Sequence, residues 1–124
     1  MAVEKLSSYD TWSYDAGADL STKQYYAMIF TAGKLAVAGA NAEVIGILQD
    51  KPNAVDVAGT VAIRGASKAV AGAAITIGDY VATDASGKLI AATVGQAVVG
   101  IALSAAGADL EVFSVLIDRT QALA

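Results

Sequence analysis

The chain has 124 residues, of which 56% are apolar, and its eight basic and twelve acidic residues give a formal net charge of −4. This length predicts one domain with a single hydrophobic core, and the acidic balance argues against a nucleic-acid or anionic-lipid partner. The chain contains neither Cys nor His. It therefore has no disulfide, and it lacks the commonest general base and metal ligand.

The first 23 residues are polar and show no hydrophobic period, and they predict an extended N-terminal arm over residues 1–23. This segment carries Tyr9, Trp12 and Tyr14, which include the only Trp of the chain. Two interpretations stay open. Either the segment packs a ring or two onto its own domain, or it docks on another subunit through these aromatic side chains. The second interpretation makes Tyr9, Trp12 and Tyr14 the candidate partner-binding residues.

From residue 24 onward, short apolar runs alternate with turn residues, which predicts a single β domain over residues 24–118 and a C-terminal tail over residues 119–124. Gly65 is expected to break the chain between two strands. Such short strands with Gly, Asn or Asp between them predict a mainly β fold, either a small barrel or a sandwich. Strands are expected at residues 24–30, 34–38, 43–48, 57–64, 67–70, 80–83, 88–92, 97–104 and 110–117.

Residues 89–108 carry no charged side chain over about the length needed to cross a membrane. The stretch is interrupted by Gly95, Gly100 and Gly107, and its second half alternates as a strand does. We therefore expect two strands joined by a turn, and no membrane as a partner.

The β domain contains an internal repeat. Residues 33–49 (GKLAVAGANAEVIGILQ) return without a gap as residues 87–103 (GKLIAATVGQAVVGIAL), with seven identities in seventeen positions. Chance would give roughly one identity in ten in a chain so rich in Ala, Gly and Val. Gly46 and Gly100 occupy the same place in the two copies. A bulge or tight bend at these glycines is favoured over the close approach of a neighbouring subunit's backbone.

The residues predict no reaction. Carboxylates such as Asp50, Asp79 and Asp84 stand at expected turns, where Asp binds backbone N–H groups. The two Gly-Lys pairs lack the upstream Gly and the following Ser or Thr of a phosphate loop. Without His, a classical nucleophile triad is excluded. We therefore expect no enzyme, no cofactor and no metal.

Several short sequence motifs, each typical of a turn or a strand, follow one another in a characteristic order. They are ADLS at 18–21, GKL at 33–35, VIGILQDKP at 44–52, VAIRG at 61–65, ITIGD at 75–79, TDASGK at 83–88 and VGIAL at 99–103. In this order, over residues 17–117, the chain resembles tailed-bacteriophage capsid decoration (cement) proteins. The resemblance implies a small trimeric β protein on the outer surface of an icosahedral head. It also implies that the protein bridges neighbouring major capsid proteins, partly through an N-terminal arm, and that it has no catalytic residues.

On this basis, deleting residues 1–15 is expected to abolish binding to the shell and to leave the β domain folded. Two alternatives belong to other classes. One is a different virion component, such as a head fibre base or a tail protein, which would be present in few copies. The other is a surface carbohydrate-binding module, which needs exposed coplanar aromatic side chains. Only Tyr80 and the pair Tyr25 and Tyr26 are available for that role.

Overall fold

The computed structural model describes residues 9–118, which form nine strands of one antiparallel sheet without a helix. The predicted mainly β fold is confirmed, and of the two expected forms, a barrel or a sandwich, the curled sheet is the barrel-like one. The strands are β1 (Tyr9–Asp15), β2 (Ala27–Thr31), β3 (Lys34–Val37), β4 (Gly46–Leu48), β5 (Ala58–Val70), β6 (Tyr80–Thr83), β7 (Leu89–Ala91), β8 (Gly100–Ala102) and β9 (Val112–Ile117).

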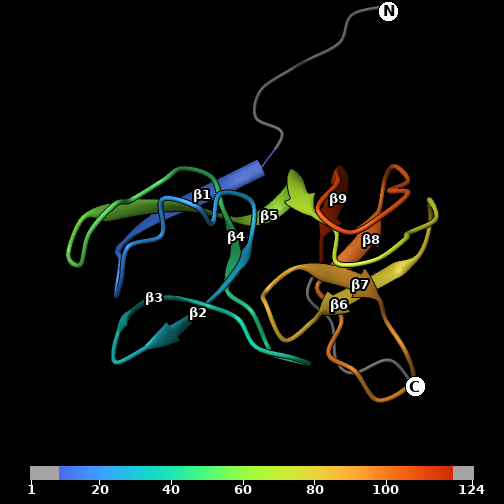
Figure 1. Ribbon diagram of the computed structural model, residues 1–124, viewed down its shortest axis with the longest axis horizontal. Helices are drawn as coiled ribbons and strands as arrows, with labels where there is room; N and C mark the ends of the chain where they lie inside the picture. The colour runs from blue at the N-terminus through green and yellow to red at the C-terminus, as the bar shows by residue number, and fades with distance from the viewer. Residues whose placement is uncertain (1–8, 119–124) are drawn as a thin grey trace, which may run out of the picture.

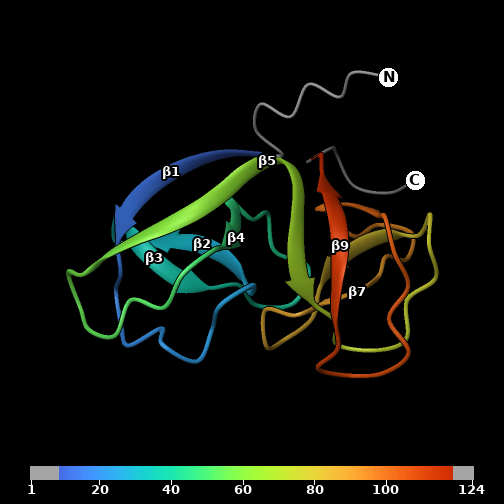
Figure 2. The same ribbon diagram turned by 90° about the horizontal axis from the view of Figure 1, so that it is seen from above.

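The longest strand is β5, and it holds the sheet together. The strand order is β3-β2-β4-β5-β9-β8-β6-β7, with β1 paired to β5. The first half of β5 pairs with β1 and β4, and its second half pairs with β9 (Figure 2). The predicted break at Gly65 is wrong. This residue, with a φ of +101°, lies inside β5 and pairs with both Tyr9 and Ile117, because glycine adopts a positive φ without a steric cost.

Strand pairing divides the fold into two units that share β5 (Figure 1). The first unit comprises β1 to β4 and residues 58–64 of β5, and the second comprises residues 66–70 of β5 and β6 to β9. In the first unit the sheet curls until Ala16 forms a parallel bridge with Leu35, and in the second unit Ala71 bridges Leu89 in the same way. Each unit is therefore a small barrel-like sheet whose first and third strands meet.

The internal repeat is confirmed, and it extends well beyond residues 33–49 and 87–103. The pairing of Ile47 with Ala62 returns as the pairing of Ile101 with Leu116. Main-chain bonds outside the strands also recur. The bond from Leu20 N to Pro52 O (2.8 Å) has its counterpart in the bond from Ile75 N to Ala106 O (2.8 Å), and that from Tyr26 N to Lys23 O (3.1 Å) in that from Asp79 N to Thr76 O (3.0 Å). Residues 9–118 thus form two copies of a five-strand unit, with the last strand of one and the first strand of the next joined as β5.

The hydrophobic core has two parts. One lies inside the first unit and consists of Ala16, Leu20, Met28, Leu35, Leu48 and Val61. The other fills the second unit and continues into the contact between the units, where Ala27, Ile47 and Ala62 of the first unit join Leu89 and Phe113 of the second. The two units therefore share one continuous contact and are not separate domains.

Thr83 fastens the two units together by hydrogen bonds. Its buried hydroxyl donates to the carbonyl oxygen of Gly39 at 2.7 Å and accepts from the backbone N–H of Ala42 at 2.9 Å. Nearby, the backbone N–H of Ala27 donates to the carbonyl oxygen of Gly87 at 2.9 Å. Buried polar groups stabilise a contact only when they are paired in this way.

The N-terminal part of the described chain lies against its own sheet. Tyr9–Asp15 form β1, which pairs along β5, and Ala16 and Leu20 are buried in the core of the first unit. Residues 9–20 therefore contribute a strand and two core side chains to the first unit. Residues 1–8 of the predicted arm and the predicted tail, residues 119–124, lie outside the described residues.

The uncharged stretch at residues 89–108 contains β7 and β8, as predicted. Within residues 9–118, no helix is long and apolar enough to cross a membrane.

Candidate functional site

The carboxylates of the turns bind backbone groups, as predicted. Asp50 Oδ1 accepts from Thr60 N at 3.0 Å, and Asp79 Oδ2 accepts from Thr76 N at 2.9 Å. Asp84 Oδ1 accepts from the N–H groups of Ser86 at 2.8 Å and of Lys88 at 3.0 Å, as the sharp turn between β6 and β7 requires. Among residues 9–118, no three acidic side chains come together as a possible metal site.

Two lysine–aspartate pairs stand at corresponding places in the two units. Lys34 Nζ donates to Asp56 Oδ1, and Lys88 Nζ donates to Asp109 Oδ1 at 2.7 Å. In both pairs the hydrogen bond to the carboxylate is the main cause that raises the pKa of the lysine. A third pair joins Arg64 Nη2 to Asp10 Oδ2 at 2.9 Å and connects β5 to β1 on the surface. These pairs hold neighbouring segments of the chain together.

The predicted partner-binding residues Tyr9, Trp12 and Tyr14 all belong to β1. The side chain of Tyr9 lies outside the described part of the structure. Trp12 is 59% exposed, and Tyr14, two residues further along the strand, points to the same side. Tyr14 is half-buried, and its ring meets that of Phe30 edge-on, with 4.6 Å between the centroids and 80° between the planes.

Trp12, Tyr14 and Phe30 define a surface of the first unit, which we call the β1 aromatic surface. Phe30, 43% exposed, reaches this surface from the neighbouring hairpin β2–β3. The sequence reasoning missed Phe30 because its position at the end of an aromatic-rich strand does not reveal whether it faces the core. Exposed aromatic rings such as those of Trp12 and Phe30 are suitable contacts for another protein.

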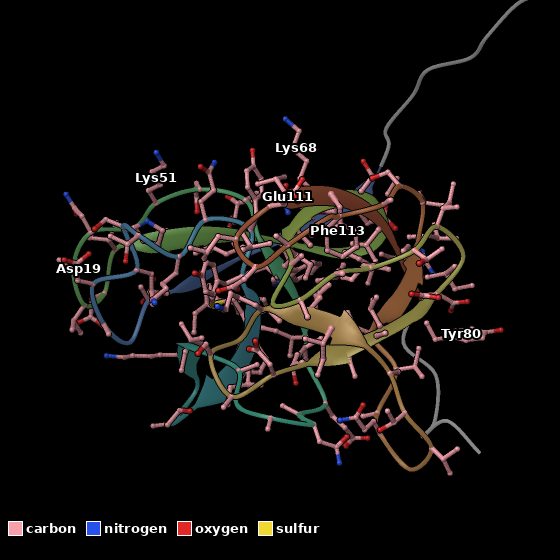
Figure 3. The ribbon with its side chains drawn as sticks, turned by 45° about the vertical axis from the view of Figure 1, so that its right-hand side comes forward. Asp19, Lys51, Lys68, Tyr80, Glu111 and Phe113 are labelled. Atoms are coloured by element: carbon pink, nitrogen blue, oxygen red, sulfur yellow. The ribbon has the colours of Figure 1, made fainter. Side chains whose placement is uncertain are left out.

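A second apolar surface crosses three strands of the second unit. Tyr80 of β6 pairs with Ile101 of β8, and Ile101 pairs with Leu116 of β9, so the three side chains form one row. Tyr80 is 48% exposed, Leu116 is 37% exposed and the adjacent Leu103 is 42% exposed. Figure 3 shows Tyr80 projecting away from the body of the molecule. We call these four residues the second-unit face.

The three tyrosines available for carbohydrate binding, Tyr25, Tyr26 and Tyr80, do not lie together on one surface. Tyr25 packs against the core shared by the two units, and Tyr26 packs against the core of the first unit. The ammonium groups of Lys68 and Lys23 lie over their rings, at 5.9 Å and 4.8 Å from the centroids respectively. Tyr25 and Tyr26 therefore serve packing in two different places, and Tyr80 stands apart on the second-unit face.

A family model described as phage cement protein matches residues 16–117. Among solved structures, the chain is similar to the N base of the head fibre gp8.5 of bacteriophage phi29, with 17% sequence identity and a TM-score of 0.74, over 90% of this chain and 96% of that one. At this identity the likeness concerns the fold. The comparison with curated proteins gives no match.

Proposed function

Because the chain belongs to the phage cement protein family, we propose that it decorates the outer surface of an icosahedral phage head, where it bridges neighbouring major capsid proteins as a homotrimer. The family membership supports a structural component of the virion with a non-enzymatic role. The bridging, the trimer and the position on the outer surface are the parts that we propose. Bridging and trimer formation need only apolar and main-chain contacts. Several simultaneous contacts make detachment from the head slow, even when every single contact is weak.

The observation that carries this proposal, beside the family, is the β1 aromatic surface. Trp12 is a large aromatic side chain that the fold leaves 59% exposed on this surface. Aromatic side chains in such positions contribute much of the binding energy of protein interfaces. We assign Trp12 and Tyr14 as contacts with the shell, with Tyr9 as a further candidate on the same strand.

The structure changes how this assignment must be tested. Deleting residues 1–15 would remove β1, whose seven residues pair along β5. It would also expose part of the core next to Ala16 and Leu20. Folding and binding would then fail together. A substitution at an exposed side chain separates the two effects.

The test is co-sedimentation of the purified protein with heads that lack it, counting bound copies per head. Saturation in multiples of three copies at each local threefold position is expected. W12S should weaken binding about tenfold or more. I77S should bind as the unchanged protein does, because Ile77 is 64% exposed but lies in the loop before β6. Equal binding by W12S would contradict the role of Trp12.

The structural likeness to a head fibre base favours a second candidate, the base of a fibre. The same experiment separates the two candidates. A fibre base would bind in only a few copies per head, whereas a cement protein covers the whole shell. A low count at saturation would move the proposal to the fibre base.

A further inference from the structure

Because the fold is duplicated, the same face of the sheet occurs once in each unit, and the two faces can be compared. The row Tyr80, Ile101 and Leu116 of the second unit corresponds to a row in the first unit, in which Ala27 pairs with Ile47 and Ile47 pairs with Ala62. The two rows lie at the same place in the two units, as the strand registers show. Their surroundings differ completely.

In the first unit this row is fully covered. Ala27, Ile47 and Ala62 are each 0% exposed and belong to the core that continues into the second unit. The second unit supplies the cover, and its residues in this core include Leu89, beside the turn between β6 and β7, and Phe113 of β9. Gly87 O of the turn accepts from Ala27 N at 2.9 Å, and Val70 N of β5 donates to Tyr25 O at 3.1 Å. The hairpin turn of the following unit is therefore one part of the cover of this sheet face.

In the second unit the corresponding face is open. Tyr80 and Leu116 replace Ala27 and Ala62, and they are 48% and 37% exposed. Within residues 9–118 no third unit follows that could cover them. Large apolar side chains in place of two alanines suit a contact between separate molecules, since aromatic side chains are enriched in the cores of interfaces.

The first unit, in turn, carries an unused copy of the covering element. Its turn between β2 and β3 contains Gly33, which corresponds to Gly87 in the repeat. Gly87 is packed so closely that a Cβ there would lie 2.4 Å from Val37 Cγ1, whereas a Cβ at Gly33 would meet nothing within 4 Å. Phe30, beside this turn, is 43% exposed. One chain thus presents an open face at one end and an open covering turn at the other.

We propose that the second-unit face binds the β2–β3 turn and Phe30 of a second copy of this chain, head to tail, repeating between molecules the contact that joins the two units within one. This inference rests on the homotrimer of the proposed function and assigns its surfaces. A contact between two different surfaces closes into a ring when the rotation allows it and otherwise continues as a filament. A ring of three copies satisfies both surfaces of every copy.

The first test is the mass of the full chain in solution, measured by analytical ultracentrifugation at about 10–100 µM. The unchanged protein is expected to sediment as a trimer. L116D and F30D, which place a charge in opposite sides of the contact, should each sediment as monomers, because an unpaired charge is costly to bury. V94D is the matched control. Val94 is 77% exposed in the loop between β7 and β8, and its variant should remain a trimer.

Mixing the two variants tests the head-to-tail arrangement directly. The intact face of F30D and the intact turn of L116D can still meet, so an equimolar mixture should form dimers and nothing larger. A monomeric unchanged protein, an unaltered mass of L116D or F30D, or a mixture that stays monomeric would overturn the proposal. Far-UV circular dichroism of each variant checks that it is folded, and L103D, on the same face, replaces L116D if that variant does not fold.

Binding to heads separates this inference from the proposed function. A protein that is monomeric in solution but saturates the heads would overturn the inference and leave the decoration role standing. A trimer that is dispersed by L116D but does not bind heads would support the inference and overturn the decoration role.

Discussion

At the scale of single residues, two glycines show what the duplication requires. A Cβ on Gly46 would lie 2.0 Å from the carbonyl oxygen of Ala62, and a Cβ on Gly100 would lie 2.0 Å from that of Leu116. Of the predicted bulge or tight bend, a bulge is not found, because Gly46 pairs with Met28 and Gly100 pairs with Val81 and Ile117 without a register shift. The close approach that was the alternative is real, but it is made by the neighbouring strand of the same chain.

We therefore predict that G46A and G100A each lower the free energy of unfolding by at least about 2 kcal/mol, because the new methyl group meets backbone atoms that cannot move aside. Urea unfolding measures this loss. G39A is the control, since a Cβ on Gly39 meets nothing within 4 Å, and it should change the stability by less than about 0.5 kcal/mol. A stability of G46A equal to that of the unchanged protein would contradict the predicted clash.

At the scale of elements, the pair Lys88–Asp109 ties the start of β7 to the segment before β9. Lys88 is 15% exposed, and its bond to Asp109 raises its pKa. A raised folded-state pKa stabilises the fold fully below the unfolded-state value, about 10.4, and this contribution is lost as the pH rises through the folded-state value. The contribution of the pair to the stability of the fold should therefore be insensitive to pH near neutrality.

The measurement compares thermal unfolding of the unchanged protein and K88M between pH 7 and pH 11.5. The melting temperature of K88M should be lower by a constant amount up to about pH 10, and the difference should shrink above that value. K51M controls for the loss of one positive charge, since Lys51 is exposed and points away from the body (Figure 3). A difference that grows with pH would show that the pair is not the cause.

At the scale of the whole molecule, the two units should unfold together. The larger core contains Ala27, Ile47 and Ala62 from the first unit and Leu89 and Phe113 from the second, so neither unit keeps its core when the other is lost. Hydrogen bonds of Thr83 cross the same contact. Separate domains would show no such sharing.

The single Trp makes this prediction measurable, because Trp12 lies in the first unit. Fluorescence of Trp12 reports on that unit, and far-UV circular dichroism reports on both. The two thermal transitions should coincide, which is the test of two-state unfolding. A fluorescence transition displaced by several degrees from the dichroism transition would show that the units unfold separately.

Local patterning was enough to predict the β class, the two strands within residues 89–108, the turn role of the aspartates and the repeat. These features follow from neighbouring residues, because side-chain alternation and turn chemistry act over a few positions. The repeat at residues 33–49 and 87–103 was visible because identical side chains fill identical core positions, such as Leu35 and Leu89. Its full extent was hidden, since elsewhere the two copies keep the same hydrogen bonds with different side chains.

The tertiary structure was needed to place the N-terminal segment and the surfaces. Residues 9–15 show no hydrophobic period. They form β1 because their backbone pairs with β5, which lies far away in the sequence. The same long-range packing buries Ala27 and Ala62 and exposes Tyr80 and Leu116. Exposure depends on what covers a face, and that cover comes from another unit of the chain or from another molecule. No local pattern contains this information.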